Sequence, residues 1–310
     1  TKSVVKSILS NFPRLSKIII STWEESNKEA ISLKSLCSSK IDIIYSIDPG
    51  TKFRKKNIPH NVNRIIVSSL AGVLQSKTKY TLILRGDIFF KNNKIIYNYN
   101  KYNKNYNKSK ILVLNNTSID PERGPQLLYH CCDWLLLSDT DKLTKYLSIK
   151  KMPNEYIDWY KTHQKPEDKI DPGNLSRFMA EDYITSNGVR NLGYPILHDF
   201  YCQYSKIEKN KWFEILSNEY IVLPSKLTGT INLKYKAVLF FDSYKSISFT
   251  KWKKIDGIKI NILENLIDKL FFLFKLLLYR LFIFTFKFRN FLDLKKILLN
   301  IYNKIRLFYF

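Results

Sequence analysis

The stretch Tyr80-Thr-Leu-Ile-Leu-Arg-Gly-Asp87 is a short apolar run that ends in a basic residue, a glycine and an acid. Apolar runs of this length are typical of a buried strand. Ligands of open α/β sheets bind beyond the carboxyl ends of the strands, so we expect Asp87 to lie at a binding site. Arg85 precedes Asp87 by two residues, which predicts that both side chains face the same way. The alternative is that Asp87 only completes a turn.

Helical and strand patterns alternate around this stretch. Helices are expected over residues 1–11, 24–37, 63–77, 139–147 and 175–188. Strands are expected over residues 15–23, 41–47 and 111–115, with several short ones between 189 and 249. This alternation predicts an α/β fold in which a mostly parallel sheet is flanked by helices. Residues 91–110, rich in Asn, Lys and Tyr, are expected to form a mobile excursion around a short helix.

The balance of charges is strongly basic. Lys and Arg number 51 against 27 Asp and Glu, a formal net charge of +24. Such a balance predicts anionic partners, namely phosphorylated substrates, lipid headgroups or nucleic acid. Part of the lysine excess has a second explanation, because Lys, Asn, Ile and Tyr are all abundant, as A/T-biased coding produces. The four cysteines form no regular framework and no secretory signal is visible, which favours a reducing, cytoplasmic setting.

The C-terminal residues differ in character from the rest of the chain. Residues 263–310 contain neither Gly nor Pro and are rich in Leu, Phe, Ile and Lys, which predicts amphipathic helices. Lys275 and Arg280 interrupt the apolar run, and a central charge of this kind costs about 2.5–3.5 kcal/mol on membrane insertion. We therefore expect residues 251–310 to lie in the interface of an anionic membrane rather than to span it. The alternative is a helical pair packed on the rest of the chain or on a second subunit.

Two acidic blocks are candidates for catalysis. Glu181-Asp182 lies in a predicted helix, and paired acids there suit a general base that deprotonates a hydroxyl group. Asp133 and Trp134 lie in an apolar run, where a buried acid needs a partner. Sugars stack on aromatic faces, so this pair is a candidate for binding a saccharide. The alternatives are a solvated helix face for the first block and a helix-capping aspartate for the second.

Two residues are candidate metal ligands. Asp87, at the end of its strand, is placed to hold Mn²⁺ or Mg²⁺ against a diphosphate. His198 is followed by an acid and is a candidate second ligand, although a lone histidine is more often structural.

Several spaced blocks together resemble the WavE-type family of lipopolysaccharide synthesis, over roughly residues 1–200. The blocks are Ile18-Ile-Ile-Ser-Thr-Trp-Glu24, Asp48-Pro49-Gly50, residues 61–69, Tyr80-Thr-Leu-Ile-Leu-Arg-Gly-Asp87, His130-Cys-Cys-Asp-Trp134 and Glu181-Asp-Tyr-Ile184. Asp182 stands where that family tends to carry glutamine, so Glu181 is the safer match. Relatives usually open with a strand ahead of the first helix seen here, and we expect that strand to be missing.

The resemblance implies a GT-A-like nucleotide-diphospho-sugar fold and a glycosyltransferase of surface-polysaccharide assembly, either lipopolysaccharide or capsule. This resemblance leads to a hypothesis for the site. The residues expected to contact the nucleotide-sugar donor are Asp87, Arg85, Arg64, Asn63 and Asp48. The base that activates the acceptor hydroxyl is Glu181, Asp182 or Asp133. Trp134 binds the acceptor, and Asp87 and His198 hold the metal ion.

Residues 1–250 are expected to form the catalytic domain, and residues 251–310 the segment that associates with the membrane. The protein would then be peripheral on the inner face of the cytoplasmic membrane, where a lipid-linked saccharide acceptor is presented. Two other functions stay open: a sugar-phosphate transferase of the same fold, and a basic nucleic-acid-binding protein. No recognised nucleic-acid-binding motif supports the second, and we expect no nucleic-acid partner.

Overall fold

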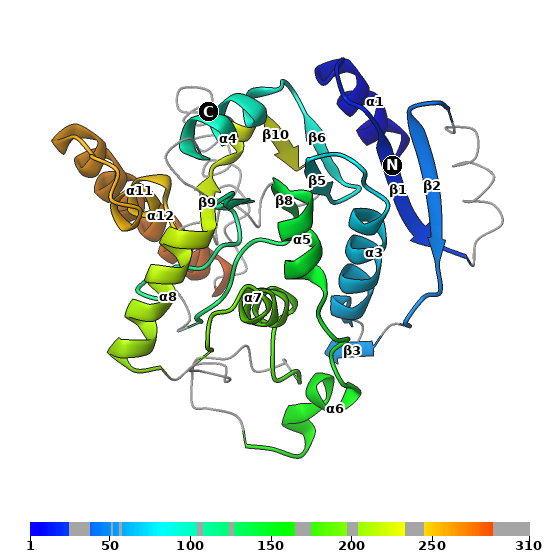
Figure 1. Cartoon of the computed structure of the whole chain (residues 1–310). Coiled ribbons are helices and arrows are strands. Elements are labelled where there is room, and N and C mark those ends of the chain that lie inside the picture. The colour runs from blue at the N-terminus through cyan, green and yellow to red at the C-terminus, as the bar shows by residue number, and fades with distance from the viewer. Residues whose placement is uncertain are drawn as a thin grey trace.

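The structure is a computed structural model of the chain that describes residues 1–24, 38–50, 52–55, 58–103, 108–123, 127–164, 175–196, 204–232 and 245–287 (Figure 1). The strands are β1 (Ile18–Trp23), β2 (Ile41–Ser46), β3 (Lys52–Lys55), β4 (Ile58–His60), β5 (Tyr80–Leu84), β6 (Ile88–Phe90), β7 (Ile111–Leu114), β8 (Leu135–Asp139), β9 (Tyr220–Leu223) and β10 (Thr230–Asn232). The helices are α1 (Lys2–Asn11), α3 (Val62–Leu74), α4 (Lys94–Asn103), α5 (Thr140–Leu147), α6 (Asn154–Ile157), the 3₁₀ turn η1 (Trp159–Lys161), α7 (Ala180–Asn191), α8 (Lys206–Glu219), α9 (Ser225–Thr228), α11 (Phe249–Ile255) and α12 (Ile262–Lys287).

Four strands form the central sheet in the order β5-β8-β7-β9. β8 runs antiparallel to both β5 and β7, whereas β7 and β9 are parallel. The fold is therefore α/β with mixed sheets, and the prediction of a mostly parallel sheet is wrong for the described strands. The apolar run that becomes β8 was not recognised as a strand, because periodicity alone does not separate a buried strand from a buried helix.

Smaller strand pairs surround this sheet. β1 and β2 are parallel, while β3–β4 and β6–β10 are antiparallel. α3 lies between the β1–β2 pair and α5 and contacts both of them as well as β5 (Figure 1). This helix therefore connects the first strand pair to the central sheet.

The core is centred on the two parallel strands of the sheet. Every residue of β7 and of β9 is buried, as expected for strands covered on both faces. Trp252 of α11 is completely buried and its indole Nε1 donates a hydrogen bond to the Tyr220 carbonyl at 3.0 Å. α11 thus packs into the same core as the central sheet.

Most of the local predictions are confirmed. β5 covers the apolar part of the stretch Tyr80–Asp87, and α1, α3 and α5 lie where helical spacing placed them. α4 is the short helix expected within residues 91–110. α7 begins at Ala180, five residues later than predicted. The helix expected over residues 24–37 lies outside the described residues, apart from its first position.

One prediction between residues 189 and 249 is wrong. Short strands were expected there, and β9 and β10 are such strands, but α8 is a helix of 14 residues. Its first turn carries a capping box, in which Ser205 and Glu208 each accept a hydrogen bond from the other's backbone N–H. This serine–glutamate spacing was a helix signal present in the sequence.

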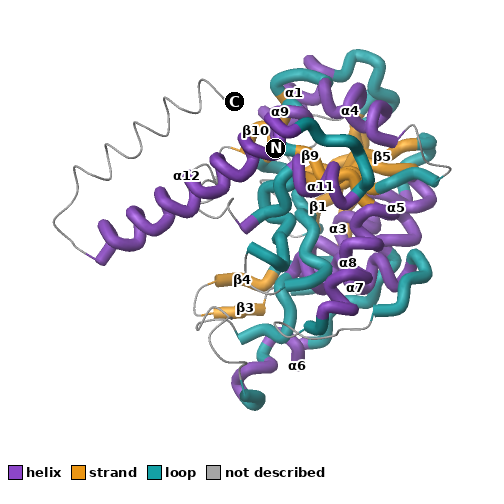
Figure 2. Tube along the Cα trace, turned by 90° about the vertical axis from the view of Figure 1, so that its left-hand side faces the viewer, coloured by secondary structure: helices purple, strands orange, loops and turns teal. Residues whose placement is uncertain are grey.

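The long C-terminal helix is confirmed over the described part of its range. α12 has 26 residues and projects from the body of the molecule (Figure 2). None of the helices in the described part of the chain combines the length and the hydropathy needed to cross a membrane.

An ion pair buried in the core connects β7 to the end of α11. The side chains of Lys110 and Asp256 are both 0% exposed, and their Nζ and Oδ1 atoms are 2.5 Å apart. Burial lowers the pKa of Lys110, and the Asp256 carboxylate opposes this effect. A charge in such a place is tolerated only with its partner, because an unpaired buried charge is costly.

We predict that Lys110→Met lowers the free energy of unfolding by about 3–5 kcal/mol, because it leaves the Asp256 carboxylate buried without its cation. The double variant Lys110→Met/Asp256→Leu should recover most of that loss, since neither position then carries a buried charge without its partner. Urea unfolding followed by circular dichroism measures both values. Equal losses in the single and the double variant would show that the ion pair is not what matters at this position.

Candidate functional site

The antiparallel pairing of β5 with β8 brings two of the predicted blocks together. Leu84 pairs with Leu135 in the register of these strands. One residue further on, the Arg85 N–H donates to the Trp134 carbonyl at 3.0 Å. The carboxyl end of β5 is therefore adjacent to the amino end of β8, and Asp87 lies in the same region as the residues that precede β8.

Arg85 is held between an acid and an aromatic ring. Its Nη2 lies 3.1 Å from Asp87 Oδ2, and the centre of its guanidinium lies 5.0 Å from the centroid of the Trp134 ring. Trp134 is only 6% exposed. In the structure, the Trp134 ring orients Arg85 through a cation–π contact. The predicted role of Trp134 in acceptor binding stays a prediction.

The segment that precedes β8 is fixed by several backbone hydrogen bonds. The Cys131 N–H donates to Thr185 Oγ1 of α7 at 3.3 Å, and the Cys132 N–H donates to Ser118 Oγ at 3.0 Å. Tyr129, at the start of this segment, has a φ of 55°, in the left-handed region. Such a conformation in a residue other than glycine costs on the order of 1 kcal/mol and clusters at functional sites. The strain is retained here because neighbouring elements hold the segment in place.

His130 and Asp182 form a buried pair inside the site. The His130 Nδ1 atom is hydrogen-bonded to the Asp182 carboxylate, whose other oxygen accepts the Met179 N–H at 3.3 Å. Burial alone would lower the pKa of His130, but the charge and hydrogen bond of Asp182, reinforced by Glu181, raise it to about 9. Asp182 therefore caps its own helix and holds a histidine. Sequence reasoning did not identify this pair, although a buried acid in α7 needs a partner.

Asp133 is a buried acid of the site with a raised pKa. It is 8% exposed and its Oδ1 has no hydrogen-bond partner among the described residues. Burial raises the pKa of Asp133 to about 7; Glu181 adds to this effect, and Arg85 and His130 oppose it. Asp87 Oδ1 is likewise buried without a hydrogen-bond partner in the described structure. Two such oxygens, on acids that both feel the charge of Arg85, indicate a site for a polar ligand.

The other predicted donor residues form a second group near the start of α3. Arg64 makes a two-pronged ion pair with Asp48, with 2.8 Å between Arg64 Nε and Asp48 Oδ1. The Arg64 guanidinium lowers the pKa of Asp48. The Asn63 amide binds both backbone groups of Met152, donating to its carbonyl at 3.0 Å and accepting its N–H at 2.6 Å. In the structure, these side chains make contacts that stabilise the fold. Their contact with a nucleotide-sugar donor stays a prediction.

The metal prediction concerns Asp87 and His198. Asp87 Oδ2 is held by Arg85, which leaves Oδ1 for a cation. A single carboxylate oxygen fits the way Mg²⁺ is bound when substrate phosphates and water complete its shell. His198 lies outside the described residues. Within the described ranges, no group of three or more His, Cys, Asp or Glu side chains is arranged to hold a metal ion.

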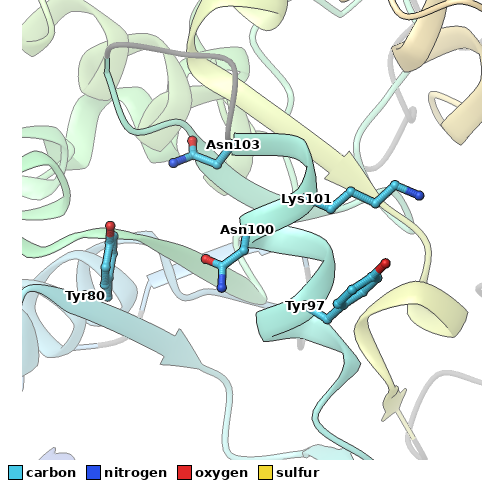
Figure 3. Close-up of a pocket in the computed structure, with 5 residues that line it drawn as sticks. All are labelled: Tyr80, Tyr97, Asn100, Lys101 and Asn103. Atoms are coloured by element: carbon cyan, nitrogen blue, oxygen red, sulfur yellow. The ribbon is translucent and has the colours of Figure 1, made fainter.

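A separate surface pocket of about 520 Å³ lies at the other end of β5. It is lined by Tyr80 at the start of that strand and by four residues of α4, namely Tyr97, Asn100, Lys101 and Asn103 (Figure 3). Asn103 Oδ1 already accepts the Lys110 N–H at 2.9 Å. The length of β5 separates this pocket from Asp87, so the pocket is not part of the candidate site.

Perturbed, partly unsatisfied carboxylates at strand ends are typical of an enzyme with an α/β fold. The chain belongs to the WavE lipopolysaccharide synthesis family, whose model matches residues 1–280. The predicted resemblance is confirmed, and the match extends well beyond the first 200 residues. Comparisons with curated proteins and with solved structures gave no match. Membership of this family gives the chain a role in lipopolysaccharide synthesis.

We predict that Asp133→Asn removes part of the pH dependence of stability. The pKa of Asp133 rises from an ordinary 3.8 to about 7 in the folded protein, so folding favours the neutral acid. The contribution of the neutral Asp133 side chain to the stability of the fold is complete below the ordinary pKa of 3.8 and is lost as the pH rises through 7. The variant should therefore become more stable relative to the wild type, by a few kcal/mol, as the pH rises from 4 to 8.

The measurement is urea unfolding at a series of pH values. Asp141→Asn, at an exposed position in the first turn of α5, is the matched control. Its curve should run parallel to that of the wild type. The prediction is wrong if Asp133→Asn also gives a parallel curve.

Proposed function

We propose that this protein is a glycosyltransferase that moves a sugar from a nucleotide-sugar donor to a lipid-linked or polysaccharide acceptor. The observation that carries the proposal is the pair of buried carboxylate oxygens, on Asp87 and Asp133, that have no hydrogen-bond partner in the described structure. Arg85 is paired with Asp87, and its charge also acts on Asp133. The family role in lipopolysaccharide synthesis supports it, because assembly of a polysaccharide requires glycosyl transfer. A GT-A-like arrangement, with the donor over the end of β5, is part of the same proposal.

The donor diphosphate is assigned to Arg85 and Asp87. A guanidinium presents several N–H donors in a plane and binds phosphate oxygens with two hydrogen bonds. Trp134 and Asp87 hold the Arg85 guanidinium from two sides, so little conformational freedom is lost on binding. Gly86, between Arg85 and Asp87, has open space around it: the nearest atom to a side chain added there would be Thr1 Oγ1, at 3.8 Å. A diphosphate can therefore approach the backbone closely.

A divalent ion, Mn²⁺ or Mg²⁺, belongs to the proposal as part of the donor complex. The residue that would hold it is Asp87, through Oδ1. Such an ion supplies charge neutralisation for the leaving diphosphate.

Asp133 is proposed as the general base. In the transfer, the acceptor hydroxyl loses its proton to the Asp133 carboxylate and its oxygen bonds to the anomeric carbon. The bond from that carbon to the phosphate oxygen breaks, and the nucleoside diphosphate leaves with the electron pair. A base with a pKa near 7 combines a large ionised fraction with useful basicity at neutral pH. Glu181 keeps this pKa high, and the His130–Asp182 pair positions the segment that carries Asp133.

We predict that Asp87→Asn lowers kcat/KM for donor turnover about 100-fold or more, because the amide no longer holds the divalent ion that would offset the charge of the diphosphate. The assay is hydrolysis or transfer with a panel of nucleotide sugars and Mn²⁺, with and without chelator. The matched control is Asp42→Asn, which alters an exposed acid paired with Lys17 at the surface. Undiminished turnover in Asp87→Asn would contradict the assignment. A product that keeps a phosphate on the transferred sugar would instead favour a sugar-phosphate transferase.

We predict that kcat/KM of the wild type rises with pH through about 7, as the Asp133 carboxylate ionises in the free enzyme. Asp133→Asn should be at least ~100-fold slower and should lose this rise. The pH–rate profiles of the two proteins, measured at limiting donor concentration, provide the test. If the variant keeps the rise, another group is the base, and Glu181→Gln becomes the variant to measure.

A further inference from the structure

The inward side of α12 carries acidic side chains beside aromatic ones. The two described acids of the helix face inward and are paired there. Glu264 Oε2 lies 2.8 Å from Lys253 Nζ, and Asp268 Oδ2 lies 3.5 Å from Arg123 Nη2 and accepts the Ser248 hydroxyl at 2.9 Å. In an ordinary surface helix, the acids face solvent and the apolar side faces the core.

The inward side also contains Lys275, one of the two charges that interrupt the apolar run of the C-terminal segment. Lys275 Nζ lies 4.6 Å from the centroid of the Phe271 ring, and Arg123 stacks on Phe272 at 4.5 Å. Burial lowers the pKa of Lys275 to about 8, and Asp268 opposes this effect. Lys275 therefore lies on the side of α12 that faces the body.

The outward side of α12 is a stripe of leucines. The stripe consists of Leu263, Leu266, Leu270, Leu273 and Leu277, which are between 50% and 63% exposed. They follow one another at intervals of three and four residues, so they form a single row along the helix. A contiguous apolar row on a projecting helix marks an interaction surface (Figure 2).

The charges beside the leucine stripe are basic. Lys269 and Arg280 are exposed, and each follows a stripe leucine by three residues, which places both on the same edge of the row. The helix has no other acid than the two that are paired with the body. The outward side of α12 thus combines apolar area with positive charge and carries no negative charge.

We infer that the leucine stripe of α12 docks onto the surface of an anionic lipid bilayer, with the helix lying along the interface. The leucines enter the boundary of the acyl chains, and Lys269 and Arg280 meet the headgroups. This inference deepens the proposed function by naming the surface at which a lipid-linked acceptor is met. A nucleic acid would leave the leucines in water. If two copies packed through the stripe, the basic residues beside each stripe would lie along the same contact and repel one another.

The test is co-sedimentation of the full chain with vesicles of mixed phosphatidylglycerol and phosphatidylcholine, compared with phosphatidylcholine alone. We expect the wild type to partition into the mixed vesicles and to be released by salt. Leu270→Glu/Leu273→Glu should lower the partition coefficient by about tenfold or more. Lys269→Gln/Arg280→Gln should lower it by about fivefold for each lost charge, and only on the anionic vesicles.

The matched control is Ile207→Glu, which places the same new charge on an apolar side chain of α8 that is 73% exposed. Its partition should equal that of the wild type, and circular dichroism checks the fold of each variant. Unchanged binding of Leu270→Glu/Leu273→Glu would overturn the inference. So would a wild-type dimer in sedimentation without lipid that the leucine variant dissociates, because a second copy would then cover the stripe. No sugar substrate is present, so this inference and the proposed transfer reaction can fail separately.

Discussion

The antiparallel pairing of β5 with β8 is the constraint on which the candidate site depends. A parallel strand in the place of β8 would begin beside Tyr80, and the residues that precede it would lie a full strand length from Asp87. Antiparallel pairing instead places the start of one strand against the end of the other, and a single backbone hydrogen bond from Arg85 to Trp134 continues the ladder into the loops. The change of strand direction is thus also the reason that Asp87 and Asp133 share a site.

Burial and pairing determine which acids of the site are available for chemistry. Asp182 is held by His130 and by the backbone of its own helix, so it acts on the position of its neighbours. Asp133 and Glu181 lie close enough to repel one another, while Asp133 has one oxygen without a hydrogen-bond partner in the described structure. Three acids that look alike in the sequence therefore have different roles, because each has different neighbours in the fold.

The sequence predicts the elements of this fold better than their arrangement. β5 and the helices around it follow from local periodicity and turn residues, which act over a few positions. The direction of β8 depends on contacts between distant segments, and an apolar run carries no information about direction. The same limit applies to the site: the sequence shows Asp87 at a strand end, Asp133 in an apolar run and Glu181 in a helix. The pairing of His130 with Asp182, and the inward orientation of Lys275, arise only when α7 and α12 are packed.

The excess of basic residues makes a buried acid without an ion pair informative about the candidate site. The chain has 51 Lys and Arg and 27 Asp and Glu, so even complete pairing would leave 24 basic residues without an acid. Deep acids such as Asp256, Glu219 and Asp120 are indeed each met by a lysine in the described structure. Against this background, a buried carboxylate without such a contact stands out. Asp133 is buried, no lysine or arginine forms an ion pair with it in the described structure, and its Oδ1 has no hydrogen-bond partner there, which is why it is the acid proposed for chemistry.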